Sequence, residues 1–131
     1  MVAERVLVVE DEPAILKIIR MTLQRLGYAV IEAGSAQDAL AAAARYDGSL
    51  DLLLTDVIMP EMNGLNLYER IATTHPETRV IFMSGYSADV FRERSVKKED
   101  FPFLSKPFSM QQLSAKVREV LDTGWSRKQR S

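Results

Sequence analysis

The chain has 131 residues, which fits a single domain with one hydrophobic core. Hydrophobic residues make up 47% and charged residues 27%, the balance of a globular rather than a disordered protein. The formal net charge of −1 gives no basic field for nucleic acid, and the lack of cysteine excludes disulfides and cysteine-based metal sites. The apolar runs are shorter than the roughly 20 residues needed to cross a bilayer, and no signal-peptide pattern opens the chain. We therefore expect a cytoplasmic protein without membrane contact.

Five short apolar runs alternate with helical patterns along the chain. The runs predict strands at residues 5–9, 28–32, 51–55, 79–83 and 102–104. Two of these runs are continuously apolar over three or four residues, as expected of parallel strands buried on both faces. After the first run, steps of three and four predict an amphipathic helix with one apolar stripe made of Leu16, Ile19, Leu23 and Leu26.

Capping residues mark where several helices begin and end. Pro13 suits the first turn of the first helix, and Gly27 suits its end. Ser35 predicts the start of a second helix. Ser109 and Gln112 have the spacing of a capping box and predict the start of the last helix.

Strand–helix alternation repeated five times predicts an α/β fold, an open parallel sheet with helices on both faces. Short connections and right-handed crossovers leave few topologies. We favour the flavodoxin-like doubly wound order 2-1-3-4-5, which the resemblance described below also favours. The domain is expected to span residues 1–122, and residues 123–131 are expected to form a polar tail too short to be an output domain.

Polar residues follow four of the predicted strands. Glu10 and Asp11 follow the first strand, Asp56 the third, Ser84 the fourth and Lys106 the fifth. The carboxyl ends of the strands share one edge of a doubly wound sheet, where ligands bind. Three acidic groups, one hydroxyl and one ammonium should therefore converge there.

Such crowded carboxylates need a counter-charge. Two unit charges about 4 Å apart interact by roughly 4 kcal/mol at an effective dielectric constant of about 20, so the acids must protonate or bind a cation. Oxygen ligands favour Mg²⁺, with Mn²⁺ as a substitute. Taken singly, residues 10–12 could be a solvated helix start and Asp56 a turn residue. Their combination at the ends of separate strands indicates a site.

Four ordered motifs resemble those of two-component response-regulator receiver domains. They lie at residues 6–12, 54–64, 82–85 and 104–108, and the resemblance runs from about residue 5 to residue 122. It implies that Asp56 accepts a phosphoryl group from a phosphohistidine on a histidine kinase or histidine phosphotransfer protein. The chain would then assist its own phosphorylation and dephosphorylation rather than act as an enzyme on other molecules.

The resemblance also assigns roles around Asp56. It implies that Asp11, Asp56 and the main-chain carbonyl of Ile58 bind Mg²⁺, while Glu10, often Asp in the family, reaches the metal through water. Lys106 would pair with the phosphoryl oxygens and be followed by a cis peptide bond to proline.

A conformational switch is implied as well. Ser84 would donate a hydrogen bond to the phosphoryl group, which would draw its loop inward. Phe103 would then turn inward into the space that the loop leaves. The face formed by the fourth helix, fifth strand and fifth helix would then change, and it could also form a homodimer. Phe103 is often Tyr in the family. Without a hydroxyl, its exposure forfeits about 1.5–3 kcal/mol, so we predict that Phe103 stays mostly inward even without phosphate.

Ile58, Gly85 and Tyr86 would flank the phosphoryl group, and the bulk of Ile58 and Tyr86 predicts shielding from water and slow dephosphorylation. The motifs resemble receivers of hybrid histidine kinases as well as stand-alone receivers, and we favour the former slightly. His75, the only histidine, is interpreted as a loop residue.

Three alternative functions fit the sequence less well. A phosphatase with an aspartyl nucleophile would need an acid two residues after Asp56, where Ile58 stands. A flavin-binding module would need a phosphate loop after the first strand, but the acids at residues 10–12 would repel phosphate. A receiver-like binding module that is not phosphorylated is disfavoured by the intact set of site residues.

Overall fold

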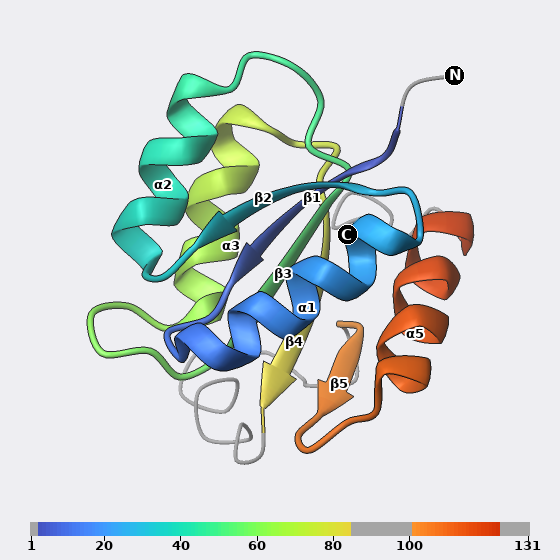
Figure 1. The fold of residues 1–131 in the computed structure, drawn as a ribbon. Coiled ribbons are helices and arrows are strands. Elements are labelled where there is room, and N and C mark those ends of the chain that lie inside the picture. Colours follow the sequence, from blue (N-terminus) through green and yellow to red (C-terminus); the bar gives the residue numbers. More distant parts are fainter. Residues whose placement is uncertain (1–2, 85–100, 124–131) are drawn as a thin grey trace.

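The computed structural model describes residues 3–84 and 101–123, which form a five-stranded parallel sheet in the order β2-β1-β3-β4-β5 (Figure 1). The strands are β1 (Arg5–Val9), β2 (Ala29–Ala33), β3 (Leu52–Asp56), β4 (Arg79–Ser84) and β5 (Phe103–Ser105). The flavodoxin-like doubly wound fold predicted from the sequence is confirmed. Each predicted strand boundary differs from the observed one by at most one residue.

Helices cover both faces of the sheet. α1 (Pro13–Arg25) and α5 (Met110–Thr123) lie on one face, and α2 (Ala36–Arg45) and α3 (Gly64–Thr74) lie on the other (Figure 1). Successive residues of β1 alternate between the two cores. Val6 and Val8 pack on the α1/α5 side, and Leu7 and Val9 pack on the α2/α3 side, which explains the continuous apolar run.

The predicted caps are found at the helix ends. α1 begins at Pro13, and Gly27 beyond its C-terminus adopts φ 97°. The Ser35 hydroxyl accepts a hydrogen bond of 3.0 Å from the amide of Asp38. At the start of α5, Ser109 and Gln112 each accept a hydrogen bond from the other's amide, at 3.0 and 2.8 Å. α5 continues through Thr123, the first residue of the predicted tail.

The prediction for Leu26 was wrong. Ile19 and Leu23 are fully buried, but Leu26 is 54% exposed. The helix ends at Arg25, so the 3.6-residue period stops before Leu26, and the left-handed Gly27 then redirects the chain. Apolar spacing alone therefore extended the stripe one residue too far.

His75 is more than a loop residue. It caps the C-terminus of α3, its ring is buried, and its Nε2 lies 3.0 Å from the carbonyl oxygen of Ala43. The hydroxyl of Thr78 donates a hydrogen bond of 2.9 Å to the carbonyl of Leu50 nearby. The first contact ties the end of α3 to the last turn of α2, and the second ties the turn after α3 to the segment between α2 and β3.

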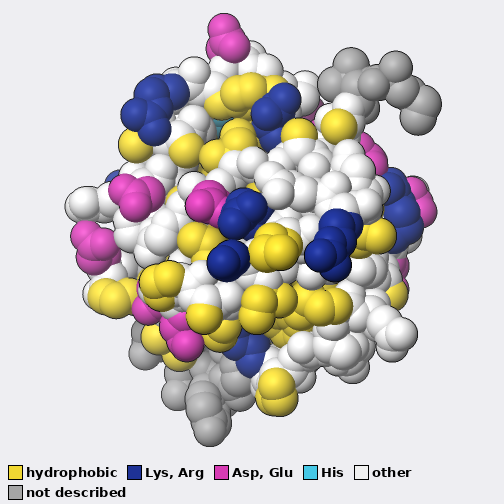
Figure 2. All heavy atoms as spheres, viewed as in Figure 1, with side chains coloured by type: hydrophobic (Ala, Val, Ile, Leu, Met, Phe, Trp, Pro, Cys, Tyr) yellow, Lys and Arg dark blue, Asp and Glu magenta, His cyan; other side chains and the backbone are white. Residues whose placement is uncertain are grey.

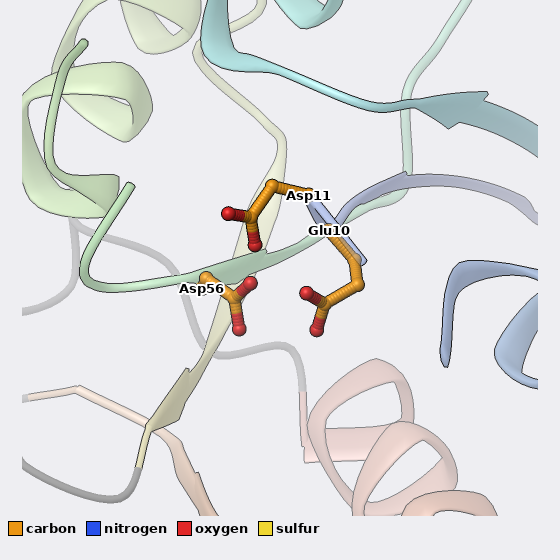
Figure 3. A group of neighbouring side chains, drawn as sticks. All are labelled: Glu10, Asp11 and Asp56. Carbon is orange, nitrogen blue, oxygen red and sulfur yellow. The ribbon is translucent and has the colours of Figure 1, made fainter. Parts of the chain in front are cut away.

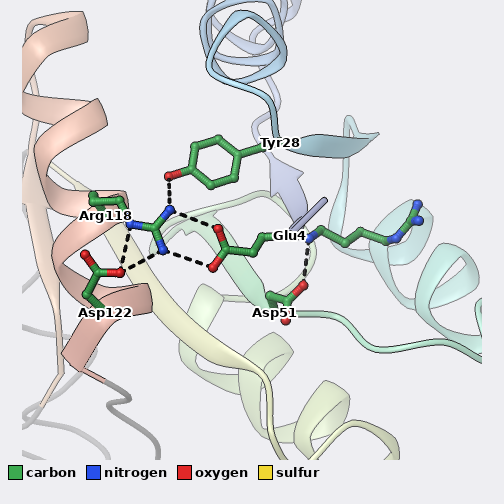
Figure 4. Close-up of polar contacts among 6 residues, drawn as sticks. Glu4, Tyr28, Asp51, Arg118 and Asp122 are labelled. Atoms are coloured by element: carbon green, nitrogen blue, oxygen red, sulfur yellow. Dashed lines mark hydrogen bonds and ion pairs between the residues drawn. The ribbon is translucent and has the colours of Figure 1, made fainter. Parts of the chain in front are cut away.

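At the opposite end of the sheet from the strand carboxyl termini, Arg118 of α5 holds the segment that enters β1. Its guanidinium donates to Glu4 at 2.9 and 3.0 Å, to Asp122 at 3.0 Å and to the hydroxyl of Tyr28 at 3.1 Å (Figure 4). One side chain thus links α5 to the residues that directly precede β1 and β2. Among the described residues, no helix has both the length and the apolar character needed to cross a bilayer.

Candidate functional site

The phosphoacceptor candidate, Asp56, is the last residue of the central strand β3 and is only 4% exposed. Its backbone is paired with Met83 of β4. The amide of the next residue, Val57, donates a hydrogen bond of 3.1 Å to the carbonyl of Met83. Because β3 lies between β1 and β4, the position of this carboxylate is fixed from both sides.

Glu10 and Asp11 follow β1, the neighbouring strand, and their side chains point toward Asp56 (Figure 3). Glu10 is completely buried, whereas Asp11 is exposed. One carboxylate oxygen from each of the three acids lies within 4.8 Å of the others. The sequence prediction that these acids converge is therefore confirmed.

Lys106, after β5, brings an ammonium group into contact with two of these three acids. Its Nζ lies 2.7 Å from Oε1 of Glu10 and 2.6 Å from Oδ1 of Asp56. Its own amide donates 3.1 Å to the carbonyl of Ser84, which fixes the end of β5 against β4. The peptide bond between Lys106 and Pro107 is cis, as predicted.

Burial and the close contacts shift the pKa values of this group. Burial raises the pKa of Asp56 to about 7, and Glu10 acts in the same direction while Lys106 opposes it. Burial also disfavours ionised Glu10, but hydrogen bonds with Asp56 and Lys106 outweigh it and lower the pKa of Glu10. Desolvation disfavours charged Lys106, yet hydrogen bonds to both carboxylates raise its pKa. Below about pH 7, the two buried carboxylates therefore hold one proton, on Asp56.

The donor set fits a hard divalent cation. All three side chains offer carboxylate oxygens, and one ammonium does not neutralise three acids. The exposure of Asp11 leaves a side of the cluster open to water, which Mg²⁺ retains when bound to proteins. Glu10, Asp11 and Asp56 are thus the residues that could hold the metal.

A cleft of about 260 Å³ opens above the cluster. It is lined by Asp11, Glu12, Asp56, Ile58, Met83, Ser84 and Lys106. Ile58 is 59% exposed beside Asp56, where its side chain could limit access to the carboxylate. Gly85 and Tyr86, the other predicted flanking residues, lie outside the described residues.

The two predicted switch residues lie on neighbouring strands. Ser84 ends β4, is buried and is in register with Ser105 of β5. Phe103 begins β5, is half-buried and packs against the core on the α2/α3 side. Residues 85–100, between β4 and β5, which would complete the predicted switching face, lie outside the described residues.

A second, apolar groove of about 580 Å³ lies next to the site, between α1 and the connection from β5 to α5. Its lining comprises Ile15, Ile18, Ile19, Lys106, Pro107, Phe108 and Met110. Figure 2 shows hydrophobic side chains gathered around α1 on this face. Lys106 lines both clefts, so the groove adjoins the acidic cluster.

Sequence reasoning missed two contacts that support Asp56. The hydroxyl of Thr55 donates a hydrogen bond of 3.0 Å to the carbonyl of Asp56, and Gly64 packs directly against the same carbonyl. Both residues lie in the motif at residues 54–64. A glycine at the start of a helix that immediately follows the site was the signal for a close approach.

The structure thus places an acidic cluster and a lysine at the carboxyl edge of a doubly wound sheet, the arrangement that the resemblance to receiver domains implied. The family model of the response regulator receiver domain matches residues 6–118, and the chain belongs to this family. The match does not favour the phosphatase or the flavin-binding alternative.

Similar proteins include a kinase and a small receiver protein, both from Brucella abortus (strain 2308). The chain is 42% identical over 117 residues to the sensor kinase CckA, covering 89% of this chain and 12% of the kinase. It is 30% identical over 118 residues to the response regulator receiver protein CpdR, covering 90% of this chain and 97% of CpdR. A CheY-like receiver domain from Methanospirillum hungatei JF-1 superimposes with a TM-score of 0.80 at 28% identity, covering 94% of this chain and 97% of that one.

Proposed function

We propose that this receiver domain is the phosphoacceptor of a two-component phosphorelay, with Asp56 as the residue that is phosphorylated. The observation that carries the proposal is the contact of 2.6 Å between the buried Asp56 carboxylate and Lys106, beside two further acids. A structural ion pair would need one acid, not three.

The transfer is a displacement at phosphorus. A carboxylate oxygen of Asp56 attacks the phosphorus of a phosphohistidine, and the phosphorus–nitrogen bond breaks. The imidazole nitrogen leaves with the bonding electron pair. For this attack Asp56 must be ionised, and Lys106 favours that form because its ammonium lies against the same carboxylate.

Mg²⁺ held by Asp11, Asp56, the Ile58 carbonyl and, through water, Glu10 would neutralise charge on the transferring oxygens. Lys106 supplies the second positive charge and is close enough to Asp56 to contact a phosphoryl group attached there. Glu10 holds Lys106 in this place through its own contact of 2.7 Å.

After transfer, the added group carries about −1.5 to −2 charges and strong acceptor oxygens. Ser84 donates a hydrogen bond to one of them, and Phe103 turns further into the core. The face built from the fourth helix, β5 and α5 then changes and is recognised by a partner or by a second copy of the chain. Ile58 and Tyr86 slow hydrolysis by limiting access of water to the phosphoryl group.

The donor is a histidine kinase or a histidine phosphotransfer protein, encountered in the cytoplasm. Because the phosphohistidine must reach Asp56, the donor covers the apolar groove that shares Lys106 with the site. The similarity to a segment that makes up 12% of the sensor kinase CckA supports a receiver of the hybrid-kinase type. No direct role in nucleic-acid binding is proposed.

Intact mass spectrometry after incubation with Mg²⁺ and acetyl phosphate tests the proposal. The wild-type chain should gain the mass of one phosphoryl group, and EDTA or Asp56→Asn should abolish the gain. Asp47→Asn, at an exposed acid outside the cluster, is the matched control and should behave like wild type. Absence of the adduct from folded wild-type protein would instead favour a binding module that is not phosphorylated.

A further inference from the structure

We infer that Gly64 is a positioning residue of the phosphorylation site, because its lack of a side chain sets where Asp56 and the adjoining loop lie. The inference rests on the proposed function and adds to it a residue that touches neither metal nor phosphoryl group. Gly64 is the buried first residue of α3.

The space at Gly64 is filled by the backbone of the phosphoacceptor. A β-carbon placed there would overlap the carbonyl oxygen of Asp56, and would lie 3.1 Å from its carbonyl carbon and 3.2 Å from Cα of Val57. Gly64 does not have a positive φ, so backbone conformation does not require glycine at this position. The requirement is for close approach alone.

Neither partner in this contact can move freely. The carbonyl of Asp56 accepts a hydrogen bond of 3.0 Å from the Thr55 hydroxyl, and the amide of Val57 donates a hydrogen bond to β4. Gly64 is held as well, because its amide donates a hydrogen bond of 2.7 Å to the carbonyl of Val57. Asn63 caps α3 by accepting 2.8 Å from the amide of Asn66.

The bond of 2.7 Å between Gly64 and Val57 closes the loop of residues 58–63, which begins with Ile58. A β-carbon must therefore push α3 away from β3, lengthen this bond and displace the start of the loop, or else tilt the Asp56 peptide. Either change alters the relation between the Asp56 carboxylate and the Ile58 carbonyl, two of the proposed metal ligands. Displacements of about 1 Å in such sites cost roughly a hundredfold in activity.

Alanine normally stabilises a helix by about 1 kcal/mol relative to glycine, so a harmful Gly64→Ala must act through this contact. The chain offers matched controls. A β-carbon added at Gly34 would have no neighbouring atom within 4 Å. One added at Gly48 would overlap the side chain of Tyr46, so Gly48→Ala tests an overlap with a side chain and not with the backbone of Asp56. Val117→Ala, in the α1/α5 core, destabilises the fold without touching the site.

Electron paramagnetic resonance of free Mn²⁺, titrated against the full chain, measures metal affinity without phosphorylation. Gly64→Ala should weaken Mn²⁺ binding by roughly ten- to hundredfold and slow phosphorylation by acetyl phosphate in parallel. Gly34→Ala, Gly48→Ala and Val117→Ala should bind Mn²⁺ like wild type. If Gly64→Ala unfolds, all titrations are repeated in trimethylamine N-oxide, which favours the folded state.

Wild-type affinity and phosphorylation rate in folded Gly64→Ala would overturn the inference. A parallel loss of affinity in Val117→Ala would overturn it too, because the effect would then be one of stability. If wild type itself binds no Mn²⁺ and forms no adduct, the proposed function fails and this inference fails with it. A normal wild type beside an unaffected Gly64→Ala removes only the role of Gly64.

Discussion

Lys106 and Asp56 form an ion pair of 2.6 Å, yet the pKa of Asp56 is raised to about 7. The cause is that Asp56 is buried beside a second buried carboxylate, Glu10, which lies 2.7 Å from the same ammonium group. One lysine is thus shared between two acids. The ammonium group does not fully compensate the two buried carboxylates, at a cost in stability that depends on pH.

Asp56→Asn should therefore stabilise the metal-free protein at high pH. The pKa of Asp56 is about 7 in the folded state and 3.8 in the reference state, so the folded state binds more protons between these values. Wild-type stability then falls as the pH rises through this window, while that of Asp56→Asn does not. We expect the variant to be more stable by a few kcal/mol at pH 8, on the order of 1.4 kcal/mol for each unit of pKa shift, and by clearly less at pH 5.

Urea denaturation in EDTA at both pH values measures this difference. Asp47→Asn serves as the control and should show no pH-dependent gain. An equal gain at pH 5 and pH 8 would show that Asp56 is not protonated in the folded state.

Mg²⁺ should stabilise the wild-type chain, because it binds the folded acidic cluster and not the unfolded chain. At a hundredfold excess over the dissociation constant the gain is about 2.7 kcal/mol, and binding should release the proton of Asp56. Calorimetric titrations at pH 6, below the pKa of Asp56, in buffers of different ionisation enthalpy would detect this proton. Asp11→Asn should lose most of the stabilisation, whereas proton-free binding would contradict the assignment of the shared proton.

The sequence predicted the fold and the location of the site for physical reasons. Continuously apolar runs such as residues 6–9 identify strands buried on both faces, and a doubly wound sheet brings their carboxyl ends to one edge. The capping box at Ser109 fixed the start of α5 because its signal is local. The strand patterns and the helix caps depend only on residues that are neighbours in sequence, so the sequence alone is enough to predict them.

Contacts that depend on distances across the fold could not be predicted in this way. The sequence predicted that Glu10 and Lys106 lie at the same edge of the sheet, but not that their side chains touch across 96 residues of sequence. The His75 ring contacts the carbonyl of Ala43, 32 residues away in sequence, and the proposed role of Gly64 depends on how closely α3 approaches β3. These features required the three-dimensional arrangement.

Donor docking on the apolar groove predicts a separation between two kinds of phosphodonor. Ile18 is 50% exposed and lines the groove, whereas Leu26 is 54% exposed and lies outside it. Ile18→Glu should slow transfer from a histidine phosphotransfer protein that phosphorylates wild type, by about tenfold or more, since it places an unpaired charge in an apolar interface. It should leave phosphorylation by acetyl phosphate unchanged.

Leu26→Glu, with the same change in charge at similar exposure, should affect neither reaction. Rapid-quench measurement of phosphoryl transfer from each donor gives both rates. Equal slowing by the two variants would mean that added charge, and not the groove, governs the encounter.

Arg118 should contribute to stability through geometry that lysine does not reproduce. Its planar guanidinium bonds to Glu4 through two nitrogens and to Asp122 and Tyr28 as well, which holds its pKa above the usual value (Figure 4). Arg118→Lys keeps the charge but loses this fork, so we expect a loss of about 0.5–1 kcal/mol in the free energy of unfolding at low salt. The loss should shrink at 1 M salt, where the Debye length is about 3 Å.

Lys116→Gln, which breaks a single exposed pair with Glu119, is the control and should have no measurable effect in the same urea titrations. If Arg118→Lys were as stable as wild type, Arg118 would act as a point charge and the contact with Tyr28 would add nothing.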